Sequence, residues 1–512
     1  MLIRVALTVA LVAGGCGEAA PEGLTGQAVT LRVLAGDGLA DMGPVLRDAA
    51  GAIGVTVELT TTDDPARFGA ADGDFDAVWP ASEHLFRPGA TTPLFDGTTE
   101  IMYSPVILGV KPQAARRLGW DRRPVAWADV AAAAASGRFT FGMADPARSG
   151  DGLNALVAAA TALAGPGALQ PGEESRTAPR LAGLFTGQTL KSNSTSRLIR
   201  AYRDAGPGGT GFPADGLVAH ESEILTSNAS APPDRRLVPI YPADGVVTDD
   251  HPLSLLASAP EAKDAYQRLT AWLRTQAVQE RISQLTHRRP IVGGVRVSGD
   301  LAAHQPFQIP FPADPGSVDD LVDTYNDSLR RPGTTVYVLD TSGSMKGRRL
   351  TLLKNALSAL TRPDTFRRRE RITFLPFASG PRPPTTFDIP ETGPTARSLR
   401  EIRSFLGNLT AHGGTAMYDA LVRAYEIAGS EKGRIRSIVL LTDGVNKKGR
   451  DFAAFSRYHR GLPGAAPPVF TIVFGDANHA ELRRVAELTG GVTFDGTSQA
   501  LSPVFREIRG YQ

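Results

Sequence analysis

The sequence predicts an α/β protein with two successive parts, the second of which is a doubly wound sheet. Segments typical of strands and helices alternate along most of the 512 residues. A stretch with four prolines at residues 304–316 interrupts this alternation. The alternation restarts at Thr334 with a hydrophobic strand and continues to the C-terminal region. Such alternation is typical of parallel sheets whose strands are connected by helices.

The composition is that of a folded protein with buried cores. Hydrophobic residues make up 42% and charged residues 21% of the chain. The 55 basic and 53 acidic residues give a net charge of +2, which does not favour binding of nucleic acid. The single cysteine, Cys16, excludes an intramolecular disulfide framework and a cysteine-based zinc cluster.

Residues 1–15 have the pattern of a secretory signal peptide. Arg4 precedes a short apolar run, and small residues lead to Cys16. This end of the chain resembles the lipobox of bacterial lipoproteins, with Ala13 at a position where Leu or Val is commoner. The resemblance implies that Cys16 is lipidated, that residues 16–28 form a tether, and that the protein is anchored at the extracytoplasmic face of the cell membrane. The alternative is plain secretion with an incidental cysteine.

Residues 29–300 are predicted to form the first folded module. Strands are expected at 29–35, 55–59, 75–80, 103–110 and 139–143, and a helix is expected between the first two. The Gly- and Pro-rich residues 165–179 indicate a loop. Apolar residues spaced by three and four positions predict one long helix over 262–285.

Several segments of this module are similar to bacterial extracellular solute-binding proteins with two lobes. These are Asp76–Ser82, Tyr103–Val106, Ala144–Gly150 and Asn193–Ser196. The resemblance implies a periplasmic-binding-protein-like fold and a small-molecule ligand in the cleft between the lobes. Gly36-Asp37-Gly38 departs from the Ser-rich first turn of oxyanion binders. The candidate ligand-binding residues are Asp37, Trp79, Ser82, Ser104, Ser149, Ser194 and Ser196. The alternative is that the aromatic residue belongs to the core and that the serines belong to turns.

Residues 301–332 are predicted to form a Pro-rich linker with a short helix, and residues 333–512 a separate domain. Its first strand ends in Asp340-Thr341-Ser342-Gly343-Ser344. Downstream, Thr415 ends a glycine-rich loop that leads into a helix, and Asp443 follows a second buried strand. Ligands of open α/β sheets bind at the carboxyl ends of strands. Carboxylate and hydroxyl oxygens at that edge suit Mg²⁺ or Mn²⁺.

This domain resembles a von Willebrand factor type A domain, and the five oxygen-bearing residues match its metal-ion-dependent adhesion site. The resemblance implies that Ser342, Ser344 and Thr415 contact the metal. It also implies that Asp340 and Asp443 act directly or through water, and that an Asp or Glu of a protein partner takes the open coordination position. The alternative is that these residues only cap a helix and form turns.

Two functions are compatible with these features. The first is a cell-envelope lipoprotein for metal-dependent recognition of a protein or ligand, coupled to a solute-binding-like module. The second is a solute-capturing lipoprotein of a transport system, in which the C-terminal domain docks to a membrane complex. We do not expect an enzyme, because the sequence has no His-Glu-x-x-His, Gly-x-Ser-x-Gly or Walker motif and no identifiable general base.

Overall fold

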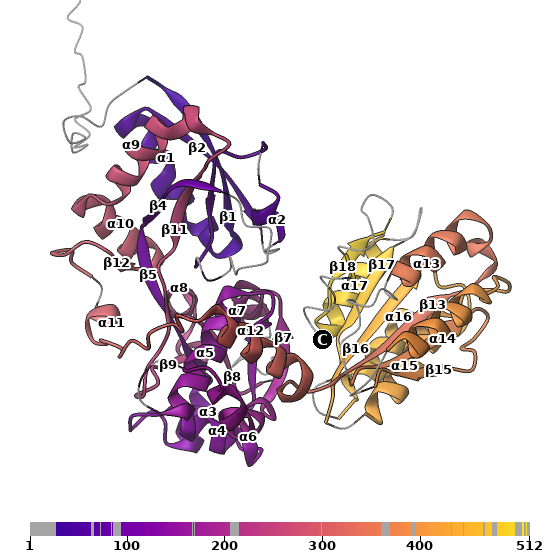
Figure 1. Ribbon diagram of the computed structural model, residues 1–512. Coiled ribbons are helices and arrows are strands. Elements are labelled where there is room, and N and C mark those ends of the chain that lie inside the picture. Colours follow the sequence, from indigo (N-terminus) through magenta and orange to yellow (C-terminus); the bar gives the residue numbers. More distant parts are fainter. Residues whose placement is uncertain are drawn as a thin grey trace, which may run out of the picture.

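The structure is a computed structural model that describes residues 27–512 with gaps. The gaps are 63–65, 72, 83, 85–93, 166, 168, 205–213, 298, 360–368, 391–394, 432, 444, 464–465, 474–478, 497–503, 506–507 and 509–512. The expected signal peptide and Cys16 lie outside the described residues. The described chain forms three α/β bodies around three sheets (Figure 1).

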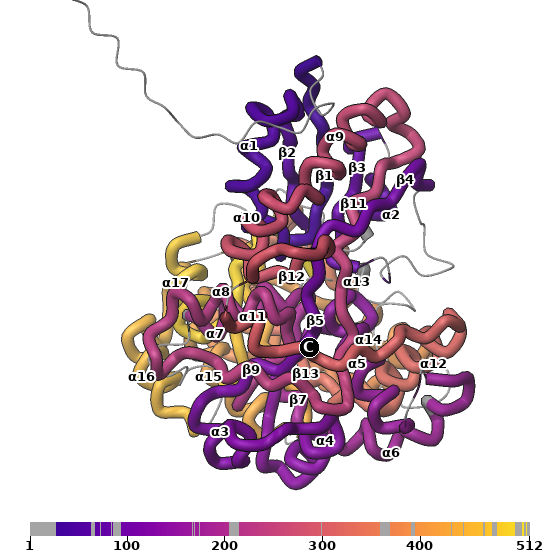
Figure 2. Tube along the Cα trace, turned by 90° about the vertical axis from the view of Figure 1, so that its left-hand side faces the viewer, coloured from indigo at the N-terminus to yellow at the C-terminus, as the bar shows by residue number. Residues whose placement is uncertain are grey.

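The first body is a lobe with a five-stranded sheet in the order β2-β1-β3-β11-β4. Its strands are β1 (Val29–Gly36), β2 (Val55–Thr62), β3 (Ala77–Trp79), β4 (Phe95–Glu100) and β11 (Pro252–Leu256). Its helices are α1 (Gly43–Ile53), α2 (Ala66–Gly69), α9 (Lys263–Leu273) and α10 (Gln276–Thr286). The helices α1, α9 and α10 lie beside the strands of this sheet (Figure 2). Their apolar residues form one core with those of β1, β3 and β11.

The second body is a lobe with a sheet in the order β10-β5-β8-β6-β7, in which β9 and β12 also pair with β5. Its strands are β5 (Met102–Val110), β6 (Phe141–Ala144), β7 (Gln188–Ser192), β8 (Gly216–His220), β9 (Val238–Ile240), β10 (Thr248–Asp249) and β12 (Arg289–Pro290). Its helices are α3 (Pro112–Leu118), α4 (Trp127–Ala135), α5 (Gly150–Ala164), α6 (Glu173–Phe185), α7 (Thr195–Asp204), α8 (Glu221–Ser230), α11 (Gly299–Ala302) and α12 (Pro315–Thr324).

Three short crossings join these lobes. The chain passes from β4 to β5 through Ile101, returns from β10 to β11 through Asp250 and His251, and crosses again between α10 and β12. Non-glycine residues with left-handed backbones occur at two crossings, His251 with a φ of 45° and His287 with a φ of 55°. The first and second bodies are therefore the two lobes of one module, as the sequence predicts.

Two of the predicted elements differ from the structure. The expected helix over 262–285 is interrupted at Arg274 and Thr275, which separate α9 from α10. The expected loop over 165–179 is partly wrong, because α6 begins at Glu173 and contains Pro179. A proline inside a helix removes one backbone N–H donor, and the burial of Leu181 and Phe185 in the core of the lobe offsets this loss.

The expected linker packs against the second lobe. The backbone N–H of Ile309 donates to the carbonyl of Val246 at 2.8 Å. Leu321 and Tyr325 belong to the core that also contains Phe185. The Tyr325 hydroxyl lies 3.0 Å from Gln188 Oε1. Much of the expected linker over 301–332 therefore packs against the second lobe and does not form an extended connection.

The third body has a six-stranded sheet in the order β15-β14-β13-β16-β17-β18. Its strands are β13 (Gly333–Asp340), β14 (Arg371–Phe377), β15 (Thr385–Asp388), β16 (Ile435–Thr442), β17 (Val469–Val473) and β18 (Thr493–Asp495). Its helices are α13 (Arg348–Ala359), α14 (Ala396–Gly407), α15 (Met417–Gly429), α16 (Phe452–Arg460) and α17 (His479–Thr489). All neighbouring pairs are parallel except β14 and β15.

Helices cover both faces of this third sheet. Alternate residues of β13 point to opposite faces, since successive side chains of a strand do so. Tyr337 and Leu339 contribute to the core shared with α13 and α14. Val336 and Val338 contribute to the core shared with α15, α16 and α17. The doubly wound sheet predicted from the sequence is confirmed.

Among the described residues, no helix combines the length and the apolar composition needed to span a membrane.

Candidate functional site

The predicted metal residues gather at the carboxyl edge of the third sheet. Asp340 is the last residue of β13, and Asp443 directly follows β16. These strands are neighbours in the sheet (Figure 1), and they pair in parallel with Leu339 opposite Leu441. From β13 the chain builds the sheet outward to β15, and it then returns to β16 and builds in the other direction. The two carboxylates therefore lie at the topological switch point, where open α/β sheets bind ligands.

A continuous series of hydrogen bonds connects three of the five residues. The hydroxyl oxygens of Ser342 and Ser344 are 3.0 Å apart. The Ser344 hydroxyl donates to Asp443 Oδ1 at 2.9 Å. The fold therefore brings the predicted turn and the second strand end into direct contact, although they are 99 residues apart in sequence.

Asp340 is held beside them by two donors. Its Oδ1 accepts from the backbone N–H of Ser342 at 2.8 Å, and its Oδ2 accepts from the Thr442 hydroxyl at 2.6 Å. The side chain is fully buried. Burial raises the pKa of Asp340, and the hydrogen bonds from Thr442 and Ser342 partly oppose this shift.

Thr415 lies on an adjoining loop that backbone hydrogen bonds hold in place. The N–H of Gly343 donates to the Gly413 carbonyl at 2.9 Å, and the Thr415 carbonyl accepts from the N–H of Lys447 at 2.8 Å. Gly413 has a φ of 88°, a left-handed conformation that favours glycine. The loop is thus tied both to the Ser342–Ser344 turn and to the segment after β16. Thr415 is itself buried.

Arg349 is a neighbour that the sequence did not single out. Its Nη1 lies 2.5 Å from Asp443 Oδ2. The Asp443 side chain is fully buried, whereas that of Arg349 is 36% exposed. The donor set of the site, two carboxylates and three hydroxyls, fits a hard divalent cation such as Mg²⁺ or Mn²⁺.

Most of the ligand-binding residues predicted in the first module surround the junction of the two lobes. The Ser194 hydroxyl donates to Asp37 Oδ2 at 3.0 Å, which connects the second lobe to the first. The Ser196 hydroxyl donates to Glu223 Oε1 at 2.6 Å. The Ser104 hydroxyl donates to Ser222, which is adjacent to Glu223 in sequence.

Ser149 has a structural role at the start of α5, where its hydroxyl accepts from the N–H of Gly152. A Cβ at Gly152 would lie 2.4 Å from the Ala144 carbonyl oxygen, so glycine allows α5 to begin directly against the end of β6. This close approach positions Asp151 in the first turn of the helix.

The remaining two predicted residues, Trp79 and Ser82, form hydrogen bonds with residues outside the predicted set. Trp79 is a fully buried core residue, and its indole N–H donates to the carbonyl of His251 at 2.9 Å. The Ser82 hydroxyl lies 3.0 Å from His84 Nδ1. For Trp79 the core interpretation therefore fits the structure better than a ligand contact.

The sequence reasoning missed the charged residues at this junction. His220 Nε2 lies 2.6 Å from Asp249 Oδ2 and 3.5 Å from Asp151 Oδ1. His220 Nδ1 lies 3.6 Å from Glu223 Oε2. The available signal was a buried strand that ends in His220, with Glu223 three residues later in the first turn of α8.

These groups strongly shift one another's pKa values. Burial and the neighbouring carboxylates raise the pKa of Asp151 to about 6, against the attraction of His220. Burial also acts on Glu223, but the nearby charged ring of His220 and the hydrogen bond from Ser196 outweigh it and lower the pKa of Glu223 to about 2. Burial lowers the pKa of His220, but Asp151 and Asp249 outweigh it and raise this pKa well above its usual value. The cluster is therefore an ion-pair network within the protein interior.

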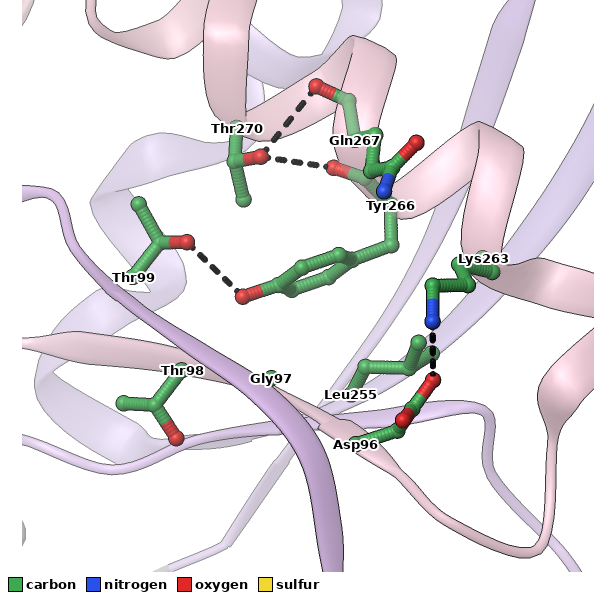
Figure 3. Close-up of a pocket in the computed structure, with 9 residues that line it drawn as sticks. All are labelled: Asp96, Gly97, Thr98, Thr99, Leu255, Lys263, Tyr266, Gln267 and Thr270. Carbon is green, nitrogen blue, oxygen red and sulfur yellow. Dashed lines mark hydrogen bonds and ion pairs between the residues drawn. The ribbon is translucent and has the colours of Figure 1, made fainter.

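A separate pocket of about 280 Å³ lies between β4 and α9 (Figure 3). Two pairs of its polar side chains bind each other: Lys263 binds Asp96 at 2.8 Å, and the Tyr266 hydroxyl lies 2.8 Å from Thr99 Oγ1 (Figure 3). None of the predicted ligand-binding residues lines this pocket. The pocket is therefore distinct from both candidate sites.

Comparison with known proteins identifies both modules. The family model of bacterial extracellular solute-binding proteins matches residues 32–284. The family model of the von Willebrand factor type A domain matches residues 334–494. The first family consists of extracellular proteins, which agrees with the extracytoplasmic location predicted from the N-terminal residues.

Curated relatives match only part of the chain. Inter-alpha-trypsin inhibitor heavy chain H4 of Homo sapiens is 28% identical over 171 residues, which are 31% of this chain and 18% of the relative. The same protein of Bos taurus is 27% identical over 170 residues, with the same coverage of 31% and 18%. The match therefore spans only 18% of the length of these relatives.

Solved structures are similar to one module or the other. A periplasmic thiamin binding protein is 13% identical and covers 60% of this chain and 100% of its own, with a TM-score of 0.47. The periplasmic binding protein P5PA is 15% identical, with coverage of 59% and 99% and a TM-score of 0.46. A von Willebrand factor type A structure from Catenulispora acidiphila is 23% identical, with coverage of 35% and 42% and a TM-score of 0.30. The two family matches carry the assignment: the chain contains a bacterial extracellular solute-binding domain at residues 32–284, followed by a von Willebrand factor type A domain at residues 334–494.

Proposed function

We propose that the C-terminal domain recognises an acidic group of a protein partner through a divalent metal, Mg²⁺ or Mn²⁺. The residues that would hold the metal are Asp340, Ser342, Ser344, Thr415 and Asp443. We further propose that Cys16 carries a lipid anchor and that recognition takes place outside the cell membrane. Neither domain belongs to a fold class defined by catalysis, so the proposed activity is binding.

One observation carries this proposal: the hydrogen-bonded series from Ser342 through Ser344 to Asp443 at the switch point of the sheet. The three oxygens come from two loops and are already directed toward one another. Preorganised ligands reduce the ordering that binding requires. The arrangement therefore supports a site for a hard cation better than an assignment of these residues to turns alone.

The chain's own residues have distinct tasks in this proposal. The Ser342 N–H and the Thr442 hydroxyl orient Asp340, and the Ser344 hydroxyl orients Asp443. When bound, the metal supplies a coordination position that a carboxylate of the partner can occupy. Only two of the five residues are carboxylates, so the site as a whole favours an anionic group of the partner.

A second function follows from the first domain. The Ser194–Asp37 hydrogen bond links the lobes of a domain whose family binds solutes. In this alternative the first domain captures a solute for transport, and the second docks to a membrane complex. Partner binding that changes with the solute, in a chain whose C-terminal site is intact, would favour this alternative.

The test uses the full chain and three proteins: wild type, Asp340→Ala and Asp388→Ala. Asp388 pairs in register with Arg371 at the opposite end of β14, so it supplies a matched carboxylate far from the candidate site. Calorimetry measures the number of Mn²⁺ ions bound. A pulldown from cell-envelope extract, with Mg²⁺ and with EDTA, measures partner capture.

We expect the Asp340→Ala chain to bind one Mn²⁺ fewer than the other two proteins and to lose the metal-dependent partner. Thermal unfolding in EDTA should show that all three proteins are folded. The proposal is wrong if Asp340→Ala binds as much Mn²⁺ as wild type, or if EDTA leaves partner capture unchanged.

A further inference from the structure

We propose that the solute-binding domain has a second metal site, for a first-row divalent transition metal, at the junction of its lobes. The ligands would be Asp151, His220 and Glu223, with Asp249 orienting the histidine. One donor atom of each of the three ligands lies within 4.8 Å of the other two. This site is independent of the one proposed for the C-terminal domain.

The ligands come from two helix starts and one strand end that the fold brings together. Asp151 lies in the first turn of α5. His220 ends β8, and Glu223 lies in the first turn of α8. Asp151 is far from His220 and Glu223 in sequence. The three residues meet because β8 pairs with β6, the strand that precedes α5. Each ligand is thus attached to a regular element, which limits its freedom to move.

The surrounding groups orient each ligand. Thr195 donates to Asp151 Oδ2 and Ser196 donates to Glu223 Oε1, so one oxygen of each carboxylate is already fixed. An ionised carboxylate can only accept, so His220 Nε2 donates to Asp249 Oδ2 over 2.6 Å. Metal-binding histidines commonly make such a bond to a carboxylate through one nitrogen and bind the metal through the other. His220 Nδ1, which lies 3.6 Å from Glu223 Oε2, would bind the metal in place of a proton.

Buried polar atoms without partners give an independent indication of a ligand. Within the described part of the chain, Glu223 Oε2 and Asn154 Oδ1 are buried and make no hydrogen bond. Asn154 is fully buried, and its amide nitrogen donates to Asp249, which places it at the junction. Most buried polar atoms in proteins make hydrogen bonds, so a buried carboxylate oxygen without one needs an explanation. The nearest charged nitrogen to Glu223 Oε2 is His220 Nδ1 at 3.6 Å, and a bound cation would give this oxygen a closer partner.

The charges around His220 also favour a bound cation. The carboxylates of Asp151, Glu223 and Asp249 all lie within 3.6 Å of a ring nitrogen of His220. The Arg288 guanidinium, another strong cation of this region, is engaged by Asp41 at 2.8 Å. Three carboxylates around one imidazole leave a negative surplus even when the ring is protonated. A ligand set that includes imidazole nitrogen favours Zn²⁺, Co²⁺ or Mn²⁺ over Mg²⁺ and Ca²⁺.

The test uses the full chain with the Asp340→Ala substitution, so that the proposed C-terminal site does not contribute. In this background we compare Glu223→Gln, His220→Ala and a matched control, His304→Ala, which removes an exposed histidine. Visible absorption follows the titration with Co²⁺, whose spectrum reports bound nitrogen and oxygen ligands. Competition with Zn²⁺ gives the affinity. Thermal unfolding of each variant without metal shows whether it is folded.

We expect the background protein and His304→Ala to bind one Co²⁺ per chain and to exchange it for Zn²⁺. Glu223→Gln keeps the size of the side chain, and we expect it to weaken binding at least tenfold, as should His220→Ala. A folded background protein that binds neither metal overturns the proposal and leaves the cluster as an internal ion-pair network. Equal affinity in Glu223→Gln also overturns it. Neither result depends on the metal site of the C-terminal domain.

Discussion

Arg349 Nη1 lies 2.5 Å from Asp443 Oδ2, so a guanidinium of α13 is paired with a buried carboxylate of the candidate metal site. The other oxygen of Asp443 accepts from Ser344. Both oxygens of this carboxylate are thus engaged by groups of the chain itself. A metal ion that binds there competes with a cation that the protein supplies.

The first prediction concerns this competition. Arg349→Ala should raise the affinity for Mn²⁺, because the carboxylate of Asp443 then has no guanidinium to neutralise it. A hydrogen bond to a charged group contributes about 1.5–3 kcal/mol, so a partial loss corresponds to roughly a three- to tenfold gain in affinity. Calorimetry checks this, with the exposed neighbour Arg348→Ala as the control. Equal affinity in Arg349→Ala and wild type would mean that Arg349 does not compete.

The second prediction concerns the packing of the proline-rich segment. Leu321→Ala should destabilise the first domain by about 2–5 kcal/mol, since Leu321 is fully buried against that lobe. All four tryptophans, Trp79, Trp120, Trp127 and Trp272, lie in the first domain, so their fluorescence reports its unfolding. The partly exposed Leu352→Ala is the control and should leave this transition unchanged. An unchanged tryptophan transition in Leu321→Ala contradicts the prediction.

The third prediction concerns pH and the C-terminal domain. Both ring nitrogens of His459 are buried, and within the described residues neither has a hydrogen-bond partner. Burial, with a smaller effect of Arg460, lowers the pKa of His459. The folded domain therefore favours the neutral ring, and this contribution to stability is fully present above the unfolded pKa of about 6.5. It is lost as the pH falls from that value toward the folded pKa, because protons then bind the unfolded state preferentially.

His459→Leu should accordingly reduce the loss of thermal stability of this domain between about pH 7 and pH 5. Calorimetry of the full chain measures the unfolding of the C-terminal domain, which tryptophan fluorescence does not follow because all four tryptophans lie in the first domain. His479→Leu removes an exposed histidine of the same domain and should behave as wild type. If both variants lose as much stability as wild type on acidification, other groups determine the acid sensitivity.

The fourth prediction concerns the membrane anchor. Cys16→Ser should release the protein from membranes into the soluble fraction after a salt wash, because the only thiol that could carry acyl chains is removed. Cell fractionation and immunoblotting measure the distribution. The control is Glu18→Ser, which introduces the same side chain into the tether but leaves Cys16 in place, and this variant should remain bound. Retention of Cys16→Ser at the wild-type level would exclude lipidation of Cys16 as the anchor.

The sequence by itself determined the two domains and the residues at the switch point of the third sheet. Asp340 and Asp443 each follow a buried strand, and parallel strands place their carboxyl ends at one edge. The order of strands and loops along the chain is therefore enough to predict that these residues meet. The serines of the first module similarly marked the region of the lobe junction, as the Ser194–Asp37 bond shows.

Only the tertiary structure decided which charged groups meet between the lobes and what the proline-rich segment does. The contacts of Asp249 with Asn154 and His220 join residues 95 and 29 positions apart, and no local periodicity encodes them. Arg349 reaches Asp443 only because the fold brings the first turn of α13 close to the end of β16. Leu321 and Tyr325 are apolar residues of a short helical segment whose partner the sequence does not specify. Such contacts form only when whole helices and strands pack together. The hydrophobic effect that drives this packing is non-directional, so it does not specify which residues meet.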